Sequence, residues 1–195
     1  LDVALDNELV DPVSSILGNH IIMWGVQLFC KPGEDGMEVP MHQDGQYWPI
    51  RPLATCALWL ALDESDRGNG CLKVVTGSHK NAVHFTHKVD HRKNLVLNHA
   101  IKDDRVSDTE VEYIELEAAQ FSLHDIYLVH GSDTNTSGRR RAGFTVRYMP
   151  SSSVLRRDLE IPCAGYPVDW AGKPLWMARG KDLSGENDFK LGHGG

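Results

Sequence analysis

Apolar runs that end at turn-forming residues divide this chain into predicted strands. The run His20–Lys31 (HIIMWGVQLFCK) stops at Pro32-Gly33, and Leu53–Leu62 (LATCALWLAL) gives way to a polar stretch. Three further runs with strand character are Val111–Leu116, Ser122–His130 and Arg141–Met149. Short β-branched and aromatic runs between Gly, Pro, Asn and Asp turns are typical of an all-β sandwich or barrel.

The segments between these runs have weaker signals. Residues Leu1–Leu17 are predicted to form a helix that packs on the outside, and the polar, His-rich stretch His79–His99 is predicted to be a loop or short helices. The chain of 195 residues suits one domain, 1–195, with residues 181–195 as a flexible tail. Because the chain does not begin with Met, we expect that an upstream portion is missing.

Composition excludes several classes of protein. With 20 basic and 27 acidic residues, the net charge of −7 does not favour binding to nucleic acid. No apolar stretch reaches the ~20 residues that span a bilayer, so we expect no membrane partner. The four cysteines are widely spaced and form no C-x-x-C motif, which indicates free thiols in a reducing, cytoplasmic setting.

A candidate metal site begins at Met41-His42-Gln43-Asp44. On a strand, residues i and i+2 point to the same face, so His42 and Asp44 are expected to project together. The tripeptide H-x-D alone is common by chance, and a surface His beside a solvated Asp is the usual explanation. His130, at the end of an apolar strand, could supply a third ligand. Two His and one carboxylate on one face of a metal leave three positions open, as in non-haem Fe(II) oxygenases.

A candidate carboxylate site follows eleven residues after His130. Arg141, Gly143, Thr145 and Arg147 alternate with an apolar set along a predicted strand. The polar, small face suits a ligand pocket, and the planar guanidinium of Arg141 could hold a carboxylate. Arg139 and Arg140 are interpreted as part of a solvated turn.

Four motifs in order give the chain a resemblance to the phytanoyl-CoA dioxygenase family, from about Ile21 to Pro150. They are VPMHQDGQYW (39–48), NGCLKVVTGSHK (69–80), LVHGSDTNTSGRRR (128–141) and FTVRYMP (144–150). The resemblance implies a double-stranded β-helix (jelly roll, cupin-like) with flanking helices, here with short or absent N-terminal family elements. It also implies Fe(II) held by His42, Asp44 and His130.

The same resemblance implies that Arg141 and Ser132 bind the co-substrate 2-oxoglutarate, and that O₂ is consumed. A small-molecule substrate would be oxidised while succinate and CO₂ are released. Related halogenases have a small residue in place of the metal-binding carboxylate. Because Asp44 fills that position, the resemblance favours hydroxylation over halogenation.

Further side chains are expected near the cofactors. Trp59 lies opposite a leucine face and is expected to line either the co-substrate pocket or the core, with equal weight. Gln27, on a face with Met23, Gly25 and Phe29, could reach the co-substrate, although a hydrogen-bonded core Gln is the more common situation.

Other polar residues are candidates for contact with substrate. They are Tyr47, Trp48, Arg51, His124 and Arg147, of which His124 is interpreted as lining the pocket without binding the metal. His84, His87 and His91 have a spacing that could bind zinc on a helix, but the lack of an apolar face favours a solvated loop that covers the site.

Two other functions compete with the oxygenase. A jelly-roll binding protein that has lost catalysis would be expected to lack a ligand or the Arg. A zinc-dependent hydrolase with the same ligands would need a general base and no carboxylate clamp. The sequence identifies neither the substrate nor the assembly, and a monomer or homodimer is expected.

Overall fold

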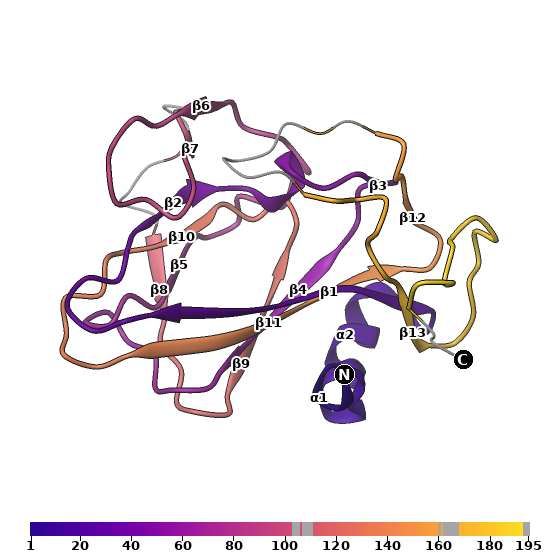
Figure 1. Ribbon diagram of the computed structural model, residues 1–195, viewed down its shortest axis with the longest axis horizontal. Coiled ribbons are helices and arrows are strands. Elements are labelled where there is room, and N and C mark those ends of the chain that lie inside the picture. The colour runs from indigo at the N-terminus through magenta and orange to yellow at the C-terminus, as the bar shows by residue number, and fades with distance from the viewer. Residues whose placement is uncertain (103–105, 107–110, 160, 162–167, 193–195) are drawn as a thin grey trace.

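A computed structural model describes residues 1–102, 106, 111–159, 161 and 168–192 of the chain. All the strand pairs formed in that part are antiparallel, with the exception of one isolated bridge (Figure 1). The larger sheet has the strand order β13-β1-β11-β4-β9, and the smaller has the order β2-β10-β5-β8.

Three strands of the larger sheet confirm predicted apolar runs: β1 (Ile21–Lys31), β4 (Cys56–Ala61) and β11 (Arg141–Pro150). The other two are β9 (Phe121–Asp125), which covers part of a predicted run, and β13 (Trp176–Arg179), which was not predicted. The smaller sheet consists of shorter strands: β2 (Val39–His42), β5 (Leu72–Val75), β8 (Val111–Ile114) and β10 (His130–Ser132). Two pairs of short strands complete the fold: β3 (Ile50–Arg51) with β12 (Val154–Leu155), and β6 (His87–Val89) with β7 (His99–Ile101). The mainly β, jelly-roll class predicted from the sequence is thereby confirmed.

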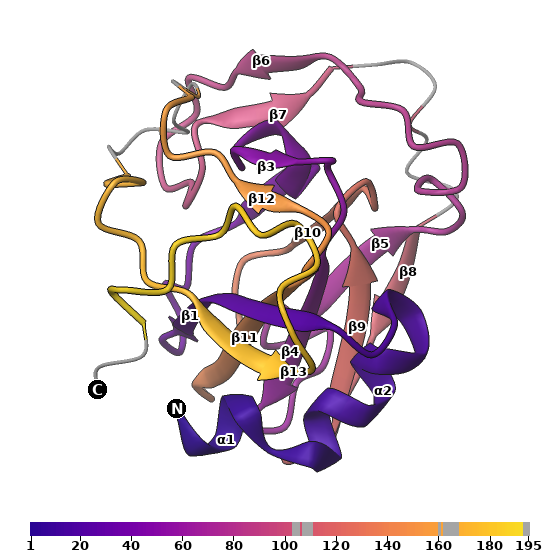
Figure 2. The same cartoon turned by 90° about the vertical axis from the view of Figure 1, so that its right-hand side faces the viewer.

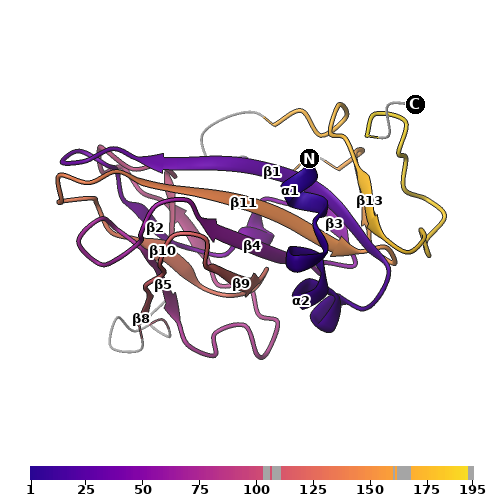
Figure 3. The same cartoon turned by 90° about the horizontal axis from the view of Figure 1, so that it is seen from below.

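The two helices cover one face of the larger sheet, as predicted for residues 1–17 (Figures 2 and 3). They are α1 (Asp2–Leu5) and α2 (Asn7–Leu17), and the side chain of Asp6 caps the start of α2 by accepting from the Glu8 N–H at 2.9 Å. Their apolar side of Ala4, Leu9, Val10 and Val13 packs on a core that includes Met23, Leu58, Val146 and Tyr148. The Tyr148 hydroxyl donates to the Ala4 carbonyl at 2.6 Å, which ties the helices to β11.

A bulge in β1 changes which side of the sheet alternate residues face. The register with β11 shifts between Met23 and Gly25, so that Met23 faces the helix-covered core and Trp24 faces the opposite side of the sheet. Beyond the bulge, Gln27 and Phe29 face the cavity between the sheets. The expectation that Met23 and Gln27 share a face is therefore wrong, because one extra residue inverts the alternation.

Two other predictions need correction. Ser122–His130 is not one strand: β9 ends at Asp125, whose carboxylate accepts from the Tyr127 N–H at 2.7 Å, and β10 begins at His130 in the other sheet. The stretch His79–His99 is mostly loop, which was one of the two predicted alternatives, but it also contains β6 and the start of β7 and no helix among its residues.

The chain after Lys181, predicted to be flexible, contacts the body of the protein up to the last described residue, 192. The Asn187 side chain bonds to the backbone of Ser153 and Leu155, and the Ser184 N–H donates to the Ser151 carbonyl. Phe189 packs against the apolar cluster around Trp24. No helix in the described part of the chain is long and apolar enough to cross a membrane.

Candidate metal and co-substrate site

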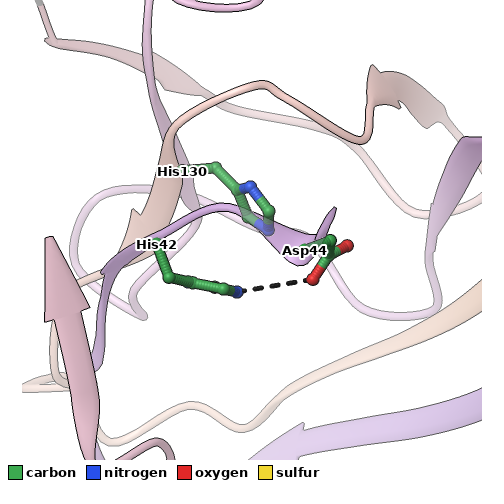
Figure 4. Close-up of side chains that lie close together, drawn as sticks. All are labelled: His42, Asp44 and His130. Atoms are coloured by element: carbon green, nitrogen blue, oxygen red, sulfur yellow. Dashed lines mark ion pairs between the residues drawn. The ribbon is translucent and has the colours of Figure 1, made fainter. Parts of the chain in front are cut away.

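Three potential metal ligands converge at one edge of the space between the sheets (Figure 4). His42 ends β2 and pairs directly with His130 at the start of β10, which brings two imidazoles that are far apart in the sequence to centroids 4.3 Å apart. Asp44 starts a 3₁₀ turn, η1 (Asp44–Gln46), and its Oδ1 lies 3.5 Å from Nε2 of His42. One ligand atom from each of the three residues lies within 4.8 Å of the others.

The predicted convergence is therefore present, but its local geometry differs from a simple strand. His42 is the last strand residue and Asp44 already belongs to the 3₁₀ turn. The side chain of the intervening Gln43 is fully buried and bonds to the backbone of other segments. Its amide bonds to the carbonyls of Val83 (2.8 Å) and Tyr127 (2.6 Å) and accepts from the Phe85 N–H (2.8 Å). These bonds fix the backbone between the two ligands.

Both histidines are oriented by their own backbone. Nδ1 of His42 lies 2.9 Å from the Pro40 carbonyl, and Nδ1 of His130 lies 2.9 Å from the Leu128 carbonyl. Because a carbonyl can only accept, each Nδ1 must carry the proton, and each Nε2 then has a lone pair for a metal. Burial, followed by the charge of His42, lowers the pKa of His130 to about 3, so its ring is neutral at physiological pH.

The carboxylate of Asp44 is held in its charged form. Burial alone would raise its pKa, but the side chains of His124 and His42 outweigh that effect and hold the pKa well below its usual value. Nε2 of His124 lies 3.8 Å from Oδ2 of Asp44, and the His124 ring lies 4.7 Å from that of His130. His124 thus lines the site beside the three ligands, as expected. One carboxylate and two imidazole donors around one point fit a divalent transition metal.

The metal site opens into a cavity of about 380 Å³ between the two sheets. Of the predicted residues, the cavity is lined by His42, Asp44, His130, Arg141, Ser132, Gln27, Trp59, Tyr47, Trp48, His124 and Arg147. The sequence did not single out Trp24, Trp170 and Lys173, which also line it.

Arg51 is the exception among the predicted contacts. Its guanidinium folds back to donate to the carbonyls of Ile50 (2.7 Å) and Trp48 (3.3 Å), and it borders a separate shallow depression with Pro52 and Arg156. Arg51 therefore does not line the main cavity, unlike the other residues predicted to contact the substrate.

The segment carrying His84 and His87 packs beside the site without forming a zinc cluster among the described residues. Nε2 of His87 accepts from the backbone N–H of Gln43 at 3.1 Å, and burial lowers the pKa of His87 to about 4. The segment therefore supports the backbone of the metal ligands.

Arg141 is 5% exposed and lies at the start of β11 with its Cζ 5.2 Å from the ring centre of Trp59. Its Nε has no hydrogen-bond partner in the described part of the chain. Burial lowers the pKa of Arg141 to about 10, which leaves it charged at neutral pH. Gly143 makes room for the ring of Trp59, because a Cβ there would overlap the indole.

The surroundings of Arg141 are also positive. Lys31 lies buried nearby, where its Nζ donates to the carbonyls of Ser132 and Asp133. Burial, together with the charge of Arg141, lowers the pKa of Lys31 to about 7. Ser132 is 3% exposed and lines the same cavity. A buried cation with an unused donor, beside a serine, fits the carboxylate of a dicarboxylic acid such as 2-oxoglutarate.

The sequence of this chain matches a known protein family. The family model described as phytanoyl-CoA dioxygenase (PhyH) matches residues 1–143. A probable phytanoyl-CoA dioxygenase of Caenorhabditis elegans is 35% identical over 144 residues, which are 69% of this chain and 46% of that protein. The chain spans about half the length of the curated relatives it matches.

Solved structures share the fold. The apo form of the non-haem monooxygenase ThoJ matches with a TM-score of 0.76 at 22% identity, over 98% of this chain and 65% of that one. The epimerase SnoN, in complex with Fe³⁺, α-ketoglutarate and nogalamycin RO, matches with a TM-score of 0.63 at 18% identity, over 86% of this chain and 69% of that one.

Proposed function

Because the chain belongs to the phytanoyl-CoA dioxygenase family, we propose that it is an iron(II)- and 2-oxoglutarate-dependent oxygenase that oxidises a small molecule and releases succinate and CO₂. The observation that carries this proposal is the meeting of His42, Asp44 and His130 within 4.8 Å, in the same cavity as the buried cation of Arg141. The SnoN complex, which holds both Fe³⁺ and α-ketoglutarate on a similar fold, supports the choice of cofactors.

His42, Asp44 and His130 would hold the iron, and Arg141 with Ser132 would hold the distal carboxylate of 2-oxoglutarate. Bound together, iron and 2-oxoglutarate supply the activation of O₂. The protein contributes the orientation of the ligands, through the Nδ1 bonds of both histidines, and a charged guanidinium in a dry site. Trp59 fixes that guanidinium in place by covering its face.

We propose hydroxylation as the reaction type. The carboxylate of Asp44 would bind the metal where a halide would otherwise bind, so halogenation is disfavoured. Tyr47 and Trp48, which follow the ligand pair directly and line the cavity, would contact the substrate. The cytoplasmic location and the monomeric or dimeric state expected from the sequence stay predictions.

The test is release of succinate from 2-oxoglutarate by the protein loaded with Fe(II), under air and with ascorbate. We expect turnover that requires iron and is inhibited by N-oxalylglycine. A zinc-dependent hydrolase would instead retain zinc on metal analysis and ignore 2-oxoglutarate. A binding protein without catalysis would bind metal and 2-oxoglutarate but release no succinate, and that result would refute the oxygenase assignment.

A further inference from the structure

We propose that the cavity contains a second anion site, in which Arg147 and Lys173 bind a carboxylate or phosphate group of the substrate while Trp24, Trp48 and Trp170 contact the rest of it. This anion subsite lies along β11 from Arg141. The two arginines are six residues apart on one face of that strand, a separation of roughly 20 Å. The inference rests on the proposed function, because it treats the cavity as a substrate site.

The two cationic side chains converge on one point of the cavity wall. A Cβ built on Gly25 would lie 3.7 Å from Cδ of Arg147 and 3.7 Å from Nζ of Lys173. Because Gly25 has no side chain, position 25 of β1 leaves room for both the Arg147 and the Lys173 side chains. Residues from two distant segments thus place positive charge together on the same wall of the cavity.

The balance of charge in the cavity favours an anion there. Among the described residues that line it, Asp44 is the only carboxylate, and that group is assigned to the metal. In the described chain, the hydrogen bonds of Lys173 involve its backbone: its carbonyl accepts from Nη2 of Arg157 at 2.7 Å and its N–H donates to the Trp170 carbonyl. Burial and the charge of Arg147 lower the pKa of Lys173, so the two cations repel each other in this structure. An anion between them would relieve that repulsion.

Aromatic rings lie around Arg147 and Lys173 and would contact the part of the substrate attached to its anionic group. Cζ of Arg147 lies 5.3 Å from the ring centre of Trp48 and 5.8 Å from that of Trp24. The rings of Trp24 and Trp48 meet edge to face at 4.6 Å, and Trp170 lies 6.3 Å from Trp24. Such a surface suits a planar or apolar body attached to the anionic group.

Gln27 has a different role in this arrangement from the one first expected. Its Oε1 accepts from Nη2 of Arg147 at 3.1 Å, from the neighbouring strand. Gln27 therefore orients the guanidinium of Arg147. It acts as a positioning residue of the anion subsite.

The experiment compares matched probes on the protein loaded with Mn(II) and saturating 2-oxoglutarate, so that Arg141 is occupied and no turnover occurs. The probes are 3-phenylpropionate, 3-phenylpropyl phosphate and the uncharged 3-phenylpropionamide, titrated by calorimetry at one fixed ionic strength. We expect at least one of the two anions to bind tenfold or more tightly than the amide. The comparison of the two anions distinguishes a carboxylate from a phosphate substrate.

Substitutions of the two cationic residues test whether the preference for anions comes from the anion subsite. Lys173→Met and Arg147→Met should each reduce the preference for the anion to below threefold, while circular dichroism shows an unchanged fold. The control is Arg139→Met, which removes an exposed arginine paired with Glu64 and Asp66 outside the cavity. This control should keep the full preference.

Three results would overturn the anion subsite: equal affinity for the amide and both anions, an anion preference that survives both subsite substitutions, or displacement of the anion by 2-oxoglutarate. Failure of the proposed function is seen separately, in the succinate assay. If the protein shows the expected preference for anions but releases no succinate, the anion subsite is supported and the oxygenase assignment is refuted. If it releases succinate but shows no preference for anions, the oxygenase assignment is supported and the anion subsite is refuted.

Discussion

Substitution of Arg141 by Met tests the co-substrate site most directly. The change keeps an unbranched side chain of similar length beside Trp59 but removes the guanidinium. In the structure, Arg141 is buried and no described carboxylate neutralises it. Its desolvation therefore destabilises the free protein, and binding of an anion would offset that unfavourable free energy. We therefore expect opposite effects on the free protein and on the complex with 2-oxoglutarate.

The expected magnitude follows from the hydrogen bonds that are lost. A bidentate guanidinium–carboxylate contact has two bonds to charged groups, each worth roughly 1.5–3 kcal/mol. Losing both would raise the dissociation constant of 2-oxoglutarate by roughly 100-fold or more, at a factor of ten per ~1.4 kcal/mol. Without 2-oxoglutarate, removal of a buried unpaired cation should leave the melting temperature unchanged or higher.

The assay is thermal unfolding with Mn(II) in place of iron, with and without 2-oxoglutarate. At a concentration 100 times its dissociation constant, the ligand stabilises the unsubstituted protein by about 2.7 kcal/mol. For a chain of this length that corresponds to a rise of roughly 5–11 °C. At the same concentration, Arg141→Met should gain about 1 °C.

The matched control is Arg140→Met. Arg140 is the adjacent residue, but it is exposed and paired with Asp63 at 2.8 Å outside the cavity. It should retain the full stabilisation by 2-oxoglutarate. The reasoning is refuted if Arg141→Met keeps that stabilisation too, or if its free form melts well below the unsubstituted protein.

Three further predictions concern the metal site and its support. Asp44→Ala should reduce Mn(II) affinity by more than tenfold in calorimetry and abolish succinate release, because one of three ligands is lost. The free energy of unfolding of the metal-free protein should fall as the pH decreases from about 6.5 to about 4. Burial lowers the pKa of folded His87 to about 4, so in this range the unfolded protein binds a proton at His87 and the folded protein does not. His87→Gln should make this decrease smaller in urea titrations. Gly143→Ala should displace the ring of Trp59 and raise the KM for 2-oxoglutarate several-fold, measured by succinate release.

Each of these has a control with the same chemistry elsewhere. Asp35→Ala removes an exposed carboxylate and should leave metal affinity unchanged, and His91→Gln removes an exposed imidazole and should leave the pH dependence unchanged. Gly138→Ala adds a methyl group where no atom lies within 4 Å and should leave the KM unchanged. The predictions are contradicted if Asp44→Ala still turns over, if His87→Gln keeps the full pH dependence, or if Gly143→Ala keeps the original KM.

The sequence predicts the elements of this fold where apolar periodicity is strong and local. The runs that form β1, β4 and β11 are long, apolar and closed by turn residues, and alternation along β11 correctly assigns Val146 to the core. For Trp59 the cavity and the core were expected with equal weight, and the structure places it in the cavity. The three-residue strands β6 and β7 contain too few positions for a period to be recognised, and they were not predicted.

The site was predictable to the extent that its residues belong to recognisable motifs. His42, Asp44, His130 and Arg141 are marked by spacing and by resemblance, and the pairing of β2 with β10 brings the two histidines together. The break between Asp125 and His130 was not predicted, because it has no Gly or Pro and depends on a side-chain bond to the backbone.

The residues of the anion subsite show the limit of sequence reasoning. Trp170 and Lys173 lie in a segment without a motif, beyond the region that the family model matches. Their place beside Arg147 depends on long-range packing. Trp24 was missed for a different reason: the bulge places its side chain on the same side of the sheet as Gln27, whereas regular alternation would place the two on opposite sides.

The bulge in β1 makes the identity of the cavity wall sensitive to the length of the chain. Deletion of Trp24 would restore regular pairing with β11 and leave the other paired residues opposite their present partners, with Met23 opposite Tyr148 and Gly25 opposite Arg147. Met23 would stay in the helix-covered core, while the cavity would lose an indole ring. A single-codon deletion here would thus enlarge one interior and leave the packing of the other in place.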